Sequence, residues 1–78
     1  MTIIVFANEA ALDALRPKLP EGLAIGTPAR SADGRVAISH PFTEEQIDWC
    51  VARGGTVYAS LADVPGWVPA EAEGERAP

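Results

Sequence analysis

The sequence predicts one small α+β domain whose six elements follow the order strand, helix, strand, strand, helix, strand. Three observations predict this fold. The chain has 78 residues, which is the length of a single domain. Residues 2–7 form a continuous apolar run, which is typical of a strand buried on both faces. Residues 43–54 carry start and stop signals for a helix.

The first strand is expected at residues 2–7, and the first helix directly follows it. The run TIIVFA is rich in β-branched side chains, which favours a central strand. Asn8 has the chemistry of a helix N-cap. Three apolar residues then repeat with helical spacing: Ala11, Leu12 and Leu15. Pro17 disfavours helical backbone at the preceding residue, so the helix should end or kink there.

The second and third strands are expected to form a hairpin. Residues 23–26 are a short apolar segment, and residues 35–40 are a longer one. Asp33 and Gly34 between them are a strong signal for a tight turn. Alternation along the third strand puts three side chains on one face: Val36, Ile38 and His40.

The second helix has the clearest signals in the chain. Thr43 and Gln46 fit a capping box, and Phe42 and Ile47 fit the hydrophobic staple that often accompanies it. Glycine at position 54 is expected to end the helix. Three residues of this helix should form its core-facing stripe: Ile47, Cys50 and Val51. Trp49 lies about 200° around the helix from Ile47 and is expected to point away from that stripe.

A fourth strand is expected at residues 55–61. The following residues are rich in proline, and the last eight are acidic and poor in large apolar groups. We therefore divide the chain into a compact domain at residues 1–62 and an extended arm at residues 63–78. Two strand–helix–strand units joined by a hairpin form the ferredoxin-like, or split βαβ, pattern. A three-stranded α+β sheet is the alternative, because residues 23–26 are a weak strand.

Composition excludes several classes of function. The net charge of −5 argues against a nucleic-acid binder, which normally presents a basic face. The longest strongly apolar run, residues 3–7, is too short to span a membrane, and no basic residue precedes it as in a signal peptide. Cytoplasmic synthesis is therefore expected. One cysteine and one histidine form neither an internal disulfide nor a zinc site, and no phosphate-binding glycine motif occurs. We expect no cofactor, no metal and no small-molecule substrate.

Cys50 and His40 raise the question of a cysteine nucleophile with a histidine base, oriented by Asp48 or Asp63. The helical stripe argues against this interpretation, because it places Cys50 in the core, where a cysteine acts as a small apolar residue. A minimal cysteine-dependent enzyme is therefore the least favoured of three hypotheses.

The two tryptophans favour a role in protein binding, since tryptophan is enriched at the centres of interfaces. Four residues are predicted to bind a partner: Trp49, Val64, Trp67 and Val68. Trp67 has an alternative role, which is to fold back and cover the open face of the sheet. We expect a non-enzymatic structural or interaction protein that works as a small subunit of a larger assembly, for instance as an accessory subunit of a phage virion. The second hypothesis is a small acidic inhibitor or regulator that binds one host protein.

Overall fold

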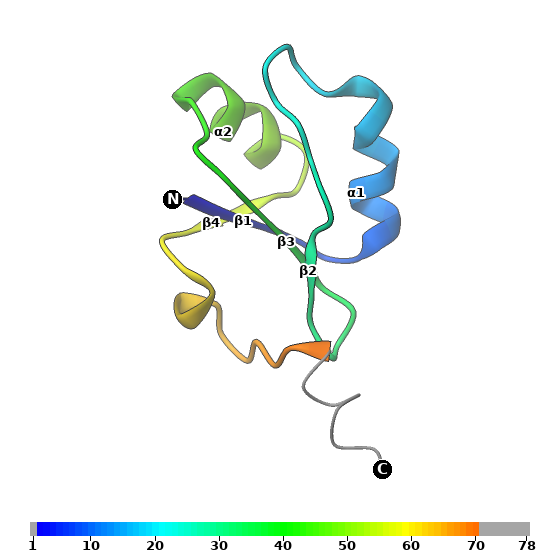
Figure 1. Ribbon diagram of the computed structural model, residues 1–78, viewed down its shortest axis with the longest axis vertical. Coiled ribbons are helices and arrows are strands. Elements are labelled where there is room, and N and C mark those ends of the chain that lie inside the picture. The colour runs from blue at the N-terminus through cyan, green and yellow to red at the C-terminus, as the bar shows by residue number, and fades with distance from the viewer. Residues whose placement is uncertain (1, 71–78) are drawn as a thin grey trace.

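The computed structural model describes residues 2–70, which fold into a four-stranded antiparallel sheet with two α-helices (Figure 1). The elements in chain order are β1 (Thr2–Phe6), α1 (Glu9–Leu15), the 3-10 turn η1 (Arg16–Lys18), β2 (Ala29–Arg30), β3 (Val36–His40), α2 (Glu44–Val51), β4 (Thr56–Tyr58) and the 3-10 turn η2 (Leu61–Asp63). The strand order is β2-β3-β1-β4. The predicted α+β class with a sheet of four strands is confirmed, although the second strand does not lie where it was expected.

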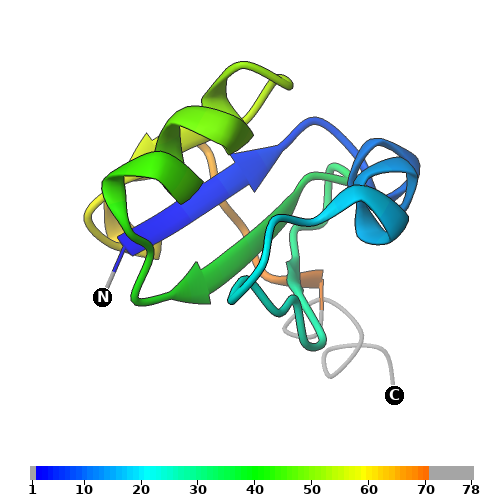
Figure 2. The ribbon, with the colours of Figure 1, turned by 90° about the horizontal axis from the view of Figure 1, so that it is seen from above.

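β1 lies in the centre of the sheet, as its unbroken apolar sequence predicts. It pairs with β3 on one side and with β4 on the other, and Figure 2 shows these two strands on opposite sides of β1. Ile4 and Phe6 face one layer of side chains, and Ile3 and Val5 face the other. All four are buried, so β1 contributes to both halves of the core.

The two helices cover one face of the sheet (Figure 1). The larger apolar cluster lies between them and the strands, and its buried members are Ile4, Phe6, Leu12, Leu23, Val36, Ile38 and Cys50. Burying an aliphatic side chain stabilises the folded state by about 1.5–3 kcal/mol. This cluster is therefore the main source of stability in a domain of this size.

Residues 61–69, which we call the covering segment, lie on the opposite face of the sheet (Figure 1). Val64 is buried there with Ile3, Val5 and Ala37, and Trp67 packs against this second cluster. The covering role considered for Trp67 is therefore confirmed. The described part of the expected arm, residues 63–70, includes most of this covering segment, and residues 71–78 lie outside the described residues.

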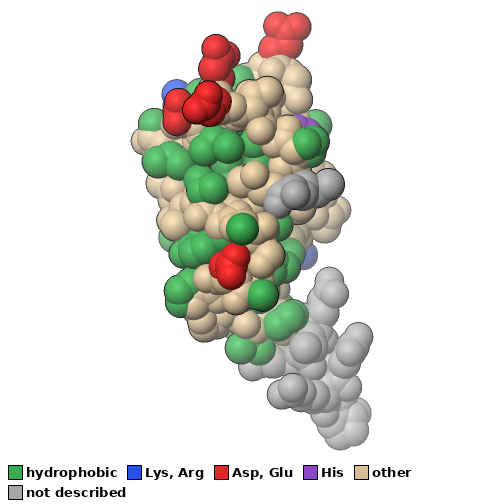
Figure 3. Space-filling model, turned by 90° about the vertical axis from the view of Figure 1, so that its left-hand side faces the viewer, with side chains coloured by type: hydrophobic (Ala, Val, Ile, Leu, Met, Phe, Trp, Pro, Cys, Tyr) green, Lys and Arg blue, Asp and Glu red, His purple; other side chains and the backbone are tan. Residues whose placement is uncertain are grey.

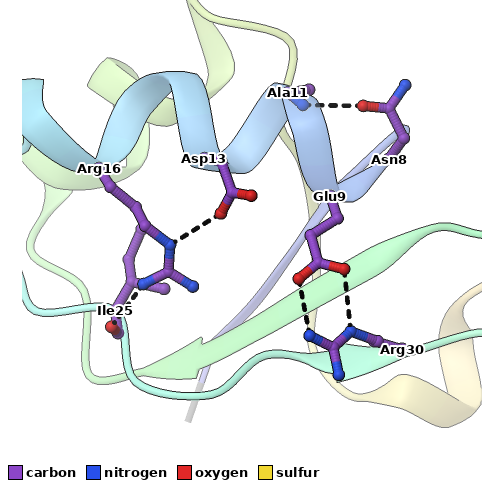
Figure 4. Close-up of polar contacts among 7 residues, drawn as sticks. All are labelled: Asn8, Glu9, Ala11, Asp13, Arg16, Ile25 and Arg30. Carbon is purple, nitrogen blue, oxygen red and sulfur yellow. Dashed lines mark hydrogen bonds and ion pairs between the residues drawn. The ribbon is translucent and has the colours of Figure 1, made fainter.

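α1 begins and ends where the sequence predicts. The N–H of Ala11 donates to Oδ1 of Asn8 at 2.8 Å, which caps the first turn (Figure 4). Leu12 is fully buried beneath the helix. After Leu15 the chain continues as the 3-10 turn that contains Pro17, because proline cannot donate the hydrogen bond that another α-helical turn needs.

Two arginines connect α1 to the chain that follows it (Figure 4). The guanidinium of Arg30 donates to both carboxylate oxygens of Glu9, at 3.1 and 2.6 Å. Arg16 donates to Asp13 at 3.0 Å and to the carbonyl of Ile25 at 3.2 Å. These contacts are exposed to solvent, so they fix the path of the connection more than they stabilise the fold.

The expectation of a strand at residues 23–26 is wrong. Leu23 follows a turn in which its N–H donates to the carbonyl of Pro20, and its side chain fills the core. The second strand instead lies at Ala29–Arg30, where it pairs with Val36 and Ala37. The apolar side chains of this segment serve burial, while the turn at Asp33 and Gly34 sets which residues pair across the hairpin.

The predicted caps of α2 are confirmed. The N–H of Thr43 donates to Oε1 of Gln46 at 2.9 Å, and the N–H of Gln46 donates to Oγ1 of Thr43 at 3.2 Å. Phe42 and Ile47 both pack against the larger cluster. Gly54 has a φ of +98°, the left-handed conformation that favours glycine after a helix.

The predicted core-facing stripe of α2 is partly wrong. Cys50 is 1% exposed, as expected, but Val51 is 48% exposed and Trp49 packs against the core cluster. Trp49 and Val51 lie about 100° to either side of Cys50. From such a flanking position the long indole reaches the core, whereas the short side chain of valine does not.

Candidate protein-binding surface

The four residues predicted to bind a partner lie in two separate places. Val64, Trp67 and Val68 belong to the covering segment, and Trp49 belongs to α2 on the other face of the sheet. Val64 is 4% exposed and Val68 is 44% exposed, so only the second is available at the surface. The structure therefore does not bring the four side chains together.

The covering segment is attached to the β2–β3 hairpin. The N–H of Ala32 donates to the carbonyl of Val68 at 2.7 Å, and Ser31 and Pro69 form an isolated antiparallel bridge. The guanidinium of Arg35 lies 5.7 Å from the ring centre of Trp67, which is a cation–π distance. Part of the Trp67 indole is therefore already covered within the chain, and a partner can contact only the remainder.

The same hairpin contains a polar network around Asp33. Its carboxylate accepts hydrogen bonds from the hydroxyl of Ser31 and from the side chain of Arg35, the latter at 2.9 Å. These bonds, that of Ser31 above all, lower the pKa of Asp33 to about 2. The carboxylate is thus ionised throughout the physiological range and holds Arg35 next to Trp67.

Trp49 is half-buried at the edge of α2. The guanidinium of Arg53 lies 4.2 Å from the ring centre, and Nη1 of Arg53 donates to the carbonyl of Trp49 at 2.9 Å. Arg53 thereby covers part of the indole and also bonds one of the last carbonyls of the helix. The tryptophan is less available to a partner than its predicted outward position suggested.

One exposed apolar edge of the molecule was not predicted from the sequence. Val51 and Val57 are 48% and 38% exposed, and β4, which carries Val57, is an edge strand of the sheet. Residues 54–62 contain no charged side chain and no proline. We call Val51 together with the uncharged strand β4 (Thr56–Tyr58) the apolar edge. Figure 3 looks onto the left-hand side of Figure 1 and shows hydrophobic side chains over much of that face, with most acidic ones toward one end.

A shallow cavity of about 240 Å³ lies beside η2. Its lining residues are Ile3, Gly26, Thr27, Ala29, Ala37, Ile38, Ser39 and Leu61. None of them has an acidic, basic or thiol group, so the cavity offers no acid–base chemistry. This volume is below the roughly 300–1,000 Å³ that is typical of small-molecule sites. A cavity of this size is better suited to one side chain of a protein partner than to a small-molecule ligand.

The side chains considered for catalysis do not form an accessible site. Cys50 is buried, and burial raises the pKa of its thiol, with the positive charge of Arg53 opposing this rise only in part. His40 is partly buried, and its ring contacts Phe42 edge-on with centroids 5.1 Å apart. Within residues 2–70, no three His, Cys, Asp or Glu side chains are placed to hold a metal ion together.

Comparison with known proteins gives no match. No family model fits the sequence, and neither the curated proteins nor the solved structures yield a significant similarity. In the described part of the chain, neither helix has the length and apolar character needed to span a membrane.

Proposed function

We propose that this chain is a non-enzymatic interaction protein that works as a small subunit of a larger assembly. The observation that carries the proposal is the apolar edge, where Val51 and Val57 are exposed beside an uncharged edge strand. Edge strands offer unpaired backbone groups to another chain, and exposed apolar side chains add area that a partner can bury. The cavity next to η2 is a second place where a partner's side chain would dock.

The buried thiol of Cys50 supports a non-enzymatic role. A cysteine nucleophile needs access to its substrate and a lowered pKa, and Cys50 has neither. The carboxylate of Asp33, whose pKa is lowered, already bonds Ser31 and Arg35, so it serves the hairpin. The finer expectation of a phage virion subunit stays a prediction, since it rests on size and composition.

We also propose that the fold is a small ferredoxin-like sheet. The strand order β2-β3-β1-β4, with β1 and β3 in the centre, supports this assignment. Both helices lie on one face, and the chain alternates strand–helix–strand units, as the pattern requires. The short β2 and β4 are the elements in which this version departs from a regular sheet.

The native mass of the protein at its natural expression level tests the proposed function. The expected result is a stable particle several times heavier than the 8.2 kDa chain, in which the Val57→Lys variant is depleted. The matched control is Ala14→Lys, which places the same charge at an exposed position of α1, away from the apolar edge. A chain that migrates alone in its native extract contradicts the proposal.

The acidic side chains in the first half of α2 favour a second candidate function, which is a regulator that binds a basic surface of its partner. Glu44, Glu45 and Asp48 are all exposed on this helix. Charged complementarity raises association rates and is screened by salt. This candidate predicts that a Glu44→Gln, Glu45→Gln variant loses partner binding and that wild-type binding weakens with salt. Binding through the apolar edge would change little in both measurements.

A further inference from the structure

The tip of the β2–β3 hairpin carries the only Asp-Gly step in the chain, Asp33 followed by Gly34. An aspartate before glycine is open to a reaction within the backbone, because glycine has no side chain to hinder attack of its nitrogen on the preceding carboxyl carbon. Both residues are exposed, so water reaches them. The other aspartates of the chain precede larger residues, which are Ala14, Trp49 and Val64. The hairpin tip is therefore the position where this chemistry is easiest.

The fold holds both reacting groups of this step in place. Oδ1 of Asp33 accepts hydrogen bonds from the hydroxyl of Ser31 and from the N–H of Arg35, and Oδ2 accepts one from Nε of Arg35 at 2.9 Å. The N–H of Gly34, whose nitrogen would attack, donates to the carbonyl of Ser31 at 3.1 Å. The bonds to the carboxylate, that of Ser31 above all, lower the pKa of Asp33, and an ionised carboxylate is a poor electrophile. The carboxyl must therefore leave Ser31 and Arg35 before it can react.

We propose that this step is a self-modification site, at which Asp33 isomerises to isoaspartate, and that the folded hairpin suppresses the reaction. The nitrogen of Gly34 bonds to Cγ of Asp33, and the carboxyl OH leaves as water together with the amide proton, which closes a succinimide ring. A water molecule then opens the ring. Cleavage between the nitrogen and the main-chain carbonyl carbon of Asp33 gives isoaspartate, whereas cleavage at Cγ restores aspartate. One water is released and one is consumed, so no other reactant is needed. This inference goes beyond the proposed function and does not depend on it.

Isomerisation at this point would release the covering segment from the hairpin. In isoaspartate the main chain passes through Cβ and Cγ of residue 33, so the turn gains one backbone atom and the alignment of the two strands is lost. Figure 1 shows the orange end of the covering segment beside the hairpin. Three contacts attach it there, all within two residues of Asp33: Ala32 with Val68, Ser31 with Pro69, and Arg35 with Trp67. Each depends on the geometry of the turn.

Ageing of the purified full chain tests the reaction. The protein is incubated in mildly acidic buffer, either folded or unfolded in guanidinium chloride, and its peptides are separated by chromatography and weighed. Isoaspartate changes the elution of the hairpin peptide but not its mass, and the succinimide is lighter by one water. Modification of Asp33 should be about tenfold slower or more in the folded chain, because a pKa of about 2 in place of 3.8 leaves less than about a tenth of the neutral carboxyl. Equal rates in the two states, or an unmodified Asp33 in the unfolded chain, overturn the inference.

Variants of the hairpin test whether its network gives the protection. Ser31→Ala removes a hydrogen bond to the carboxylate and should speed the modification of Asp33 several-fold in the folded state. Asp33→Glu is the matched control, because it keeps the carboxylate but needs a larger and less favourable ring, so position 33 should stay unmodified. Circular dichroism checks that each variant is folded, and Arg35→Lys, which loses the Nε bond but keeps the charge, serves if Ser31→Ala is not. A folded network variant that is modified no faster than the wild type contradicts the protective role.

Limited proteolysis tests the release of the covering segment. The isoaspartate form is separated from the unmodified protein and treated with chymotrypsin, which cleaves after aromatic residues. Cleavage after Trp67 should become several-fold faster in the modified form, whereas cleavage after Trp49, on the other face of the sheet, should change little. Unchanged cleavage after Trp67 would show that the segment stays in place, and equal acceleration at both tryptophans would show general unfolding. Either result overturns the proposed release.

Discussion

Gly55 lies directly against Ile4, so that a Cβ added to the glycine would stand 2.7 Å from Cγ2 of the isoleucine and 3.0 Å from the carbonyl oxygen of Cys50. No side chain fits there, because Ile4 is fully buried at the centre of the sheet and cannot move aside without disturbing its neighbours. The chain leaves α2 through this point and enters β4, so glycine is required for the helix and the sheet edge to sit this close.

Replacement of this glycine is therefore expected to destabilise the protein. Gly55→Ala should lower the free energy of unfolding by about 2 kcal/mol, the usual effect of inserting a methyl group into a packed core. Gly26→Ala is the control, because an added Cβ at that position meets no atom within 4 Å. Thermal denaturation followed by circular dichroism would measure both. Equal midpoints for the two variants would contradict the packing at Gly55.

The covering segment offers a comparison between two valines. Val64→Ala should lower the free energy of unfolding by about 1–2 kcal/mol, since it removes two buried methyl groups that face Ile3 and Val5. Val68→Ala should change it by less than about 0.5 kcal/mol, because that side chain is largely exposed. Urea denaturation measures both effects. If the two substitutions have the same effect, the segment does not cover the sheet as described.

The hairpin network predicts a dependence on pH. The pKa of Asp33 is lowered to about 2 in the folded chain, against an ordinary value near 4 in an unfolded one. Its contribution to stability is therefore fully present above about pH 4 and is lost as the pH falls toward 2. An NMR titration of the Asp33 carboxyl should show the low pKa. In Ser31→Ala the pKa should rise toward its ordinary value, because the hydroxyl is the main cause of the shift.

Cys50 should resist alkylation in the folded protein. The thiol is buried and its pKa is raised, so little thiolate is present and reagents do not reach it. Mass spectrometry after iodoacetamide treatment should show no adduct until denaturant is added. A Val68→Cys variant, treated in the same way, should be modified once at the exposed position. Rapid modification of the native wild-type thiol would revive the hypothesis of a cysteine-dependent enzyme.

Local signals in the sequence predicted some elements well. The capping box of Thr43 and Gln46 and the N-cap at Asn8 involve residues three positions apart, so the necessary chemistry is contained in one turn of chain. β1 was predictable because burial on both faces leaves an unbroken apolar run. In each case the residue types that form the element are neighbours along the chain.

Features that depend on distant parts of the chain were not predictable in this way. The apolar side chains of residues 23–26 suit either a strand or an irregular segment that fills the core. Only the position of this segment against the helices makes it the second. Val51 and Trp49 are equally displaced from Cys50, so side-chain length decides which reaches the core. The apolar edge was missed because β4 becomes an edge only through the order of strands, although its lack of charge was visible in the sequence.

The pairing of β1 with β4 has a consequence for how the protein is made. β1 is synthesised well before the segments that cover it, because Ile3 pairs with Tyr58 and packs against Val64, close to the end of the described residues. Contacts between such distant residues slow folding, because a long loop must close before they form. β1 therefore remains uncovered during synthesis until β4 and the covering segment have also left the ribosome.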